Sequence, residues 1–112
     1  MINVRIFRQA DAVITGFRVS GHAYYDDPGK DIVCAGVSAV AVGAVNAVEA
    51  LTGVVPATEM EPGFLEMQLP AACRNSAAAE KVQTILETME QMLLTIADSY
   101  GDFVRISREG LE

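Results

Sequence analysis

The chain has 112 residues, of which 51% are hydrophobic and 21% are charged, and its formal net charge is −7. This composition excludes an intrinsically disordered chain, and the length fits a single domain over residues 1–112. The excess of acidic side chains excludes a basic phosphate-binding stripe, so we expect no direct binding of nucleic acid and favour a basic partner.

The first predicted elements are two short strands that form a β-hairpin. Apolar residues alternate with other side chains over residues 2–7 and again over residues 13–20, with a turn at residues 9–11 between the two runs. A period of two is typical of half-buried strands. Residues 21–30 contain Pro28-Gly29 and are predicted to form a loop.

A long apolar helix is predicted over residues 32–51, ending near Gly53. Asp31 precedes it and is a suitable N-cap, because its carboxylate can accept a hydrogen bond from a free backbone N–H. The run is apolar nearly all round, which predicts a central position in the fold. Its length would span a bilayer, but polar side chains within it and the lack of basic or Trp anchors favour a helix of a soluble protein, with no membrane association.

Two further strands are predicted over residues 54–60 and 64–69, joined by a Pro-Gly turn. An amphipathic helix follows, with Asn75 or Ser76 as its cap and an apolar stripe over residues 82–96.

The last predicted strand covers residues 103–107. The element order is therefore ββαββαβ. It predicts one α+β domain, in which a mixed sheet is covered by two helices.

The chain contains only two cysteines, Cys34 and Cys73. A secreted domain of this size more often carries four or more, so we expect a reducing compartment. The first residues run directly into a strand and lack the pattern of a signal peptide, which favours a cytoplasmic location.

Cys34 and His22 are the candidate catalytic pair. Cys34 is near the start of the predicted helix, where free N–H groups and the helix dipole favour a thiolate, the nucleophilic form of cysteine. His22 is the only histidine, and the loop that separates it from Cys34 can fold back. The amides near Cys34, including that of Ala35, are candidate donors to an oxyanion. Asp31 is expected to cap the helix rather than orient His22.

Less specific interpretations of these residues stay open. Cys34 can be an inert core thiol, and a loop histidine is often merely solvated. A metal site using Asp26 or Asp27 is disfavoured, because structural zinc requires about four ligands, mostly Cys or His, so we expect neither metal nor cofactor. Ser38, one helical turn after Cys34, either contributes to the site or bonds back to a helix carbonyl. Cys73 has no histidine of its own and is interpreted as incidental.

Two motifs resemble the ribosomal-processing cysteine protease family, Prp. They are Gly21-His22-Ala23 and the run Asp31-Ile32-Val33-Cys34-Ala35, with Ser38 four residues after the cysteine. The resemblance covers essentially the whole chain and implies that His22 and Cys34 are catalytic. It also implies that Gly21, Tyr24, Tyr25 and Gly29 belong to a mobile substrate loop.

The same resemblance implies the biological role. Family members are homodimers that remove a short N-terminal extension from the precursor of a large-subunit ribosomal protein, after a hydrophobic, aromatic-rich motif, and this step is required for ribosome maturation. A dimer is compatible with the small residues Gly36, Ala39, Gly43 and Ala47 along one side of the predicted helix, which are otherwise just small core residues. Two alternatives remain, a non-catalytic dimeric module that binds the ribosomal protein during assembly, and a thiol redox sensor.

Overall fold

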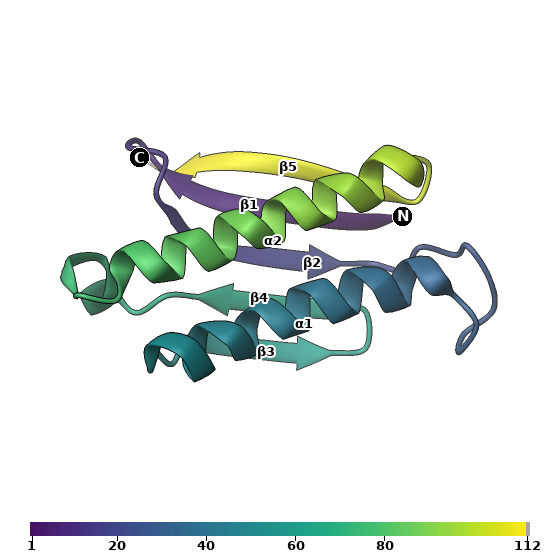
Figure 1. Cartoon of the computed structure of the whole chain (residues 1–112). Helices are drawn as coiled ribbons and strands as arrows, with labels where there is room; N and C mark the ends of the chain where they lie inside the picture. Colours follow the sequence, from purple (N-terminus) through teal and green to yellow (C-terminus); the bar gives the residue numbers. More distant parts are fainter. Residues whose placement is uncertain (112) are drawn as a thin grey trace.

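A five-stranded mixed sheet carries two long helices on one face in the computed structural model, which describes residues 1–111 (Figure 1). The strand order is β3-β4-β2-β1-β5, with β1 and β5 parallel and the other neighbours antiparallel. The elements are β1 (Ile2–Gln9), β2 (Ile14–Ser20), α1 (Ile32–Thr52), β3 (Ala57–Glu61), β4 (Phe64–Gln68), the 3₁₀ helix η1 (Ala71–Asn75), α2 (Ala79–Ser99) and β5 (Val104–Leu111). The predicted α+β class and ββαββαβ order are confirmed.

The core lies between the helices and the sheet. Alternate side chains of β1 are buried, and Phe17 of β2 is fully buried beside them. The predicted apolar stripe of α2 faces this layer, with Val82, Leu86, Met89 and Leu93 buried. The two sequence periods, two for strands and about 3.6 for helices, therefore identified the buried face of each element.

The opposite face of the sheet is polar and carries paired charges. Arg5 of β1 is hydrogen-bonded to Glu109 of β5 at 2.6 Å, and Arg18 of β2 to Glu66 of β4 at 2.5 Å. Both guanidinium groups also lie over the ring of Phe7. This polar face of the sheet is therefore suited to contact with solvent, and the two helices cover the other face only.

The bounds of α1 agree with the prediction, but its predicted central position is wrong. Gly53 ends the helix in the left-handed conformation, with φ of 77°. Only one face of α1 is buried, formed by Val33, Val37, Ala41, Ala44 and Val48. The helix is long and apolar enough to cross a membrane by length and composition. Its buried face packs in the core, and the outer face lies open because no other element within residues 1–111 covers this side (Figure 1).

The predicted cap of α2 is also wrong. The helix begins at Ala79, after η1, and Ala78 at the cap position provides no side-chain hydrogen bond. The Ser76 hydroxyl instead donates to the carbonyl of Cys73 at 2.7 Å, so it closes the preceding 3₁₀ turn.

Two strands differ from their predicted limits. β3 begins at Ala57 rather than at residue 54, after Pro56, which has no N–H to give to a ladder. β5 extends to Leu111 because its parallel pairing with β1 continues to Gln9, a long-range contact with no local signal in the sequence.

Candidate active site

Cys34 lies in the first turn of α1, where several backbone amides converge. Asp31 is the N-cap of this helix, and its Oδ1 accepts hydrogen bonds from the N–H groups of Val33 and Cys34, each at 3.0 Å. The Cys34 side chain is half-buried, and its Sγ accepts a hydrogen bond from the N–H of Ala23 at 3.3 Å. The sulfur therefore belongs to the first turn of α1 and contacts one amide from the loop.

The second carboxylate oxygen of Asp31 holds the loop that precedes the helix. Oδ2 accepts from the N–H groups of Tyr25 at 2.9 Å and Asp26 at 3.4 Å. Burial, the largest influence, would raise the pKa of the Asp31 carboxyl, but the amides of Cys34, Tyr25 and Asp26 outweigh it and lower the pKa. Asp31 thus caps the helix as predicted, and none of its hydrogen bonds within residues 1–111 involves His22.

The amides expected to bind an oxyanion already have acceptors. Those of Val33 and Cys34 donate to the Asp31 carboxylate, and that of Ala35 donates to the Asp31 carbonyl at 3.1 Å. The Ala35 amide is therefore not free in this structure. The amide that faces the sulfur is that of Ala23, which the sequence analysis had not singled out.

His22 follows β2 and approaches α1 from the sheet. Gly21 connects it to the strand and donates its N–H to the carbonyl of Gly63 at 2.9 Å, which ties this connection to the β3–β4 turn. The imidazole lies 5.8 Å from the ring of Tyr24, measured between ring centroids. Within residues 1–111, no hydrogen bond joins the His22 side chain to Cys34, although both residues line one cavity.

This cavity has a volume of about 560 Å³ and unites most of the predicted site residues. Its lining consists of His22, Tyr24, Asp26, Pro28, Gly29, Asp31, Cys34, Ala35 and Ser38. Two residues of the predicted substrate loop, Gly21 and Tyr25, are not part of this lining. Tyr24 is 77% exposed and has a φ of 55°, so it adopts the left-handed conformation that is uncommon for residues other than glycine.

Tyr25 instead anchors the loop to two aromatic residues that lie at the same end of the fold (Figure 1). Its ring makes edge-on contacts with Tyr100 at 5.5 Å and with Phe103 at 5.2 Å. These two partners lie in the connection between α2 and β5. Sequence reasoning missed both, because their contact with Tyr25 joins residues far apart in the chain and produces no local pattern.

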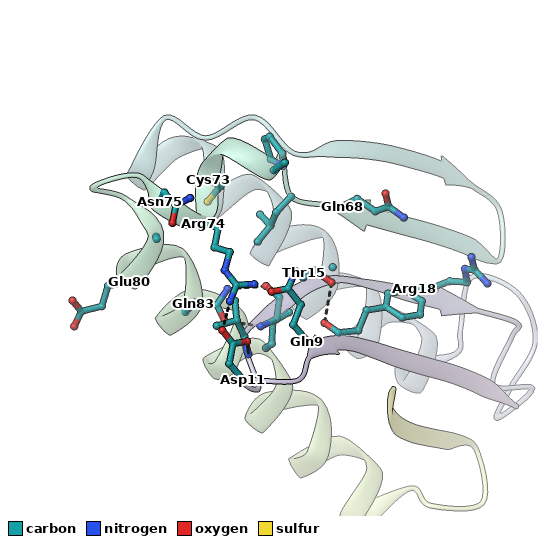
Figure 2. Close-up of a pocket in the computed structure, with 18 residues that line it drawn as sticks. Gln9, Asp11, Thr15, Arg18, Gln68, Cys73, Arg74, Asn75, Glu80 and Gln83 are labelled. Atoms are coloured by element: carbon teal, nitrogen blue, oxygen red, sulfur yellow. Dashed lines mark hydrogen bonds and ion pairs between the residues drawn. The ribbon is translucent and has the colours of Figure 1, made fainter. Parts of the chain in front are cut away.

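A larger cavity of about 870 Å³ lies at the other end of the sheet (Figure 2). Cys73, Arg74 and Asp11 belong to its lining, and Arg74 forms an ion pair with Asp11. The single histidine of the chain does not line it, so Cys73 has no imidazole partner there. The smaller cavity contains both the thiol and the imidazole, and it is therefore the candidate active site in spite of its size.

The part of the chain that the structure describes, residues 1–111, contains no group of three or more His, Cys, Asp or Glu side chains placed to hold a metal ion. Asp26, His22 and Cys34 line the same cavity without forming such a group. The polar groups at the site suit covalent and acid–base chemistry by the side chains themselves.

Comparison with known families identifies the kind of protein to which the chain belongs. The family model described as cysteine protease Prp matches residues 1–105. The chain belongs to the Prp family. The ribosomal processing cysteine protease Prp of Bacillus subtilis is 38% identical to this Prp chain over 109 residues, which cover 96% of each sequence.

Solved structures of Prp from Staphylococcus aureus have the same fold. One of them, in complex with a covalently linked product peptide, has a TM-score of 0.87 and 33% identity, covering 97% of this Prp chain and all of its own. A second, in complex with a substrate peptide, has a TM-score of 0.83 and 32% identity, with the same coverage. The family resemblance stated from the two motifs is thus confirmed, and this Prp chain is a thiol protease involved in ribosome processing.

Proposed function

We propose that this chain is an endopeptidase in which Cys34 is the nucleophile and His22 transfers the protons. The observation that carries this assignment is the shared cavity. It brings the only histidine to the same space as a thiol at a helix N-terminus, while Cys73 lies at the other end of the sheet. In a thiol protease the reactive group is a cysteine, and Cys34 is the one with a base beside it.

The reaction begins when the His22 imidazole takes the proton from Cys34 Sγ. The thiolate attacks the scissile carbonyl carbon, forming a C–S bond, and the carbonyl oxygen becomes an oxyanion. Protonated His22 then gives its proton to the leaving amine as the C–N bond breaks, leaving a thioester. Water attacks the thioester while His22 accepts its proton, and Cys34 is released with the proton restored.

The backbone around the sulfur supports the anionic steps. The N–H of Ala23 already donates to Sγ at 3.3 Å, and it lies close to where the oxyanion of an attacked peptide would form. Ser38 also lines the cavity, one turn after Cys34, and its side chain is exposed. We assign Ser38 to contact with substrate and Asp31 to holding the helix start and the loop together.

We propose that the substrate is a short N-terminal extension on a large-subunit ribosomal protein precursor, cut after a hydrophobic, aromatic-rich motif in the cytoplasm. The names of the similar proteins describe ribosomal processing, and the Staphylococcus aureus enzyme has been solved with a substrate peptide. The net charge of −7 suits a basic ribosomal protein. The exposed ring of Tyr24 and the side chain of Pro28 give the cavity an apolar edge for aromatic residues, in a loop that also contains Gly21, Tyr25 and Gly29.

The decisive experiment uses a synthetic peptide in which such an extension is joined to the first residues of the mature ribosomal protein. After incubation with the protein, we expect mass spectrometry to find two fragments that meet at one bond. Alkylation of Cys34 before the incubation, mapped by peptide digestion, should prevent the cleavage. A peptide that stays intact but binds would identify the non-catalytic binding module, and reversible oxidation of Cys34 without hydrolysis would identify the redox sensor.

We further propose a homodimer that pairs the outer faces of α1. Beyond the cavity this face is exposed and nearly uncharged, with Glu49 as its one charged residue; its small or polar members are Ala39, Gly43, Asn46 and Ala50. A Cβ atom added at Gly43 would meet no atom within 4 Å in the single chain. Gly43→Arg is therefore expected to keep the fold but to prevent dimerisation. Sedimentation should show a dimer for the unmodified chain and a monomer for the variant, and a monomer in both would contradict the dimer.

A further inference from the structure

The turn between β3 and β4 lies directly against the imidazole of His22. A Cβ atom built on Gly63 would lie 2.6 Å from Nε2 and 3.0 Å from Cε1 of His22. The first separation is shorter than real contacts of a Cβ atom and the second is shorter than most, so the ring fits in this position because residue 63 has no side chain. The Gly63 carbonyl also accepts the N–H of Gly21 at 2.9 Å, which fixes the backbone beside the histidine.

This contact surface at Gly63, which we call the seat of His22, is the main constraint on the position of the imidazole ring. His22 is otherwise exposed, and its aromatic neighbour, Tyr24, is itself exposed and 5.8 Å away. The backbone of β4 begins at the next residue, Phe64, which pairs with Ser20 at the end of β2. The seat is thus part of the sheet, whereas the loop that carries Tyr24 is not.

We propose that Gly63 is a positioning residue for the proton-transfer step, because it lets the imidazole of His22 lie against the β3–β4 turn and face the cavity. The proposal rests on the proposed function, in which His22 moves the protons. A methyl group at residue 63 would push the ring aside, since the flexible imidazole yields more easily than the paired backbone. A displacement of about 1 Å costs about 100-fold in rate when a catalytic group must be aligned.

Gly53 provides a matched control for backbone strain. Gly63 and Gly53 have φ values of 75° and 77°, and both positions are unfavourable for an alanine. A Cβ atom at Gly53 meets nothing within 4 Å, whereas one at Gly63 meets the ring. We expect Gly63→Ala to lower kcat about 100-fold with KM within about threefold, and Gly53→Ala to change both values less than about threefold.

Gly63→Asn separates the contact from the backbone conformation. Asparagine tolerates positive φ better than alanine does, yet it has the same Cβ atom. If the contact with the ring is the cause, Gly63→Asn loses as much kcat as Gly63→Ala. Recovery of kcat in Gly63→Asn, or equal losses in Gly63→Ala and Gly53→Ala, would overturn the proposal.

The single histidine supplies a readout that is independent of turnover. His22 gives the only imidazole Cε1–H signal in an NMR spectrum, and we expect this signal to move in both Gly63 variants but not in Gly53→Ala. An unmoved signal in the Gly63 variants would count against the positioning role. His22→Ala tests the proposed function separately. Full cleavage by His22→Ala would refute the proton-transfer assignment, whereas an inactive His22→Ala with a fully active Gly63→Ala would refute only the inference drawn from Gly63.

Discussion

Replacing Cys34 with alanine is expected to reduce peptide cleavage at least about 10,000-fold, because removal of a covalent nucleophile leaves only binding and oxyanion stabilisation. The fold should persist. The side chain is half-buried, and the hydrogen bond lost from the Ala23 amide is worth about 1 kcal/mol. Cleavage of the extension peptide, followed by mass spectrometry, measures the first effect, and chemical denaturation measures the second.

Cys73→Ala is the matched control for this experiment. Cys73 is also a free thiol and is 5% exposed, but it lies in η1 beside the larger cavity and away from His22. Its replacement should cost some stability through lost packing while leaving kcat nearly unchanged. Cleavage by Cys34→Ala at more than about one hundredth of the unmodified rate, or loss of cleavage in a folded Cys73→Ala, would exclude Cys34 as the sole nucleophile.

The largest expected effect on stability comes from Glu90 of α2. Its side chain is 1% exposed, and its two oxygens accept from Arg8 Nη2 and Arg108 Nε, each at 2.5 Å. Glu90→Gln leaves the Arg8 guanidinium, itself only 15% exposed, without its buried counterion. Breaking such a pair costs about 3 kcal/mol, so the free energy of unfolding in urea should fall by that amount at neutral pH.

Glu87→Gln is the control for this substitution. Glu87 also binds Arg8, but it is 52% exposed, and such a pair contributes about 0.2–1 kcal/mol. Burial, the largest influence, would raise the pKa of the Glu90 carboxyl, but the hydrogen bonds from Arg108 and Arg8 outweigh it and lower the pKa. The stability due to Glu90 is therefore present above the unfolded-state pKa and is lost as the pH falls through the lower folded pKa. The gap between the unmodified chain and Glu90→Gln should close in acid, and equal losses from both variants at neutral pH would contradict this account.

Local chemistry explains which parts of the fold and the site were predictable. The cap at Asp31, the end of α1 at Gly53 and the stripe of α2 each depend on residues close together in the sequence, and each was predicted correctly. Both motifs of the site could be recognised for the same reason, since His22 and Cys34 belong to short continuous runs. His22 and Cys34 line one cavity because a single loop joins them.

Contacts between distant residues account for what the sequence did not reveal. The seat of His22 on Gly63 and the contacts of Tyr25 with Tyr100 and Phe103 exist only once the sheet has formed. The open outer face of α1 was missed because hydrophobicity alone does not show whether a neighbour covers a helix. The sequence also did not show that the amides of Val33 and Cys34 donate to the Asp31 carboxylate and that of Ala35 to the Asp31 carbonyl, so the predicted oxyanion donors stay a prediction.

The two halves of the proposed dyad belong to different layers of the molecule. His22 is seated on the turn between β3 and β4, whereas Cys34 moves with α1, whose Val33 and Val37 pack into the core. The distance between the His22 imidazole and the Cys34 sulfur is therefore set by the packing of α1 on the sheet. A partner that shifts α1 along the sheet by a fraction of a helical turn would therefore change the rate of catalysis without entering the cavity. Substitutions in the core beneath the helix would likewise change turnover while every polar group of the site is kept.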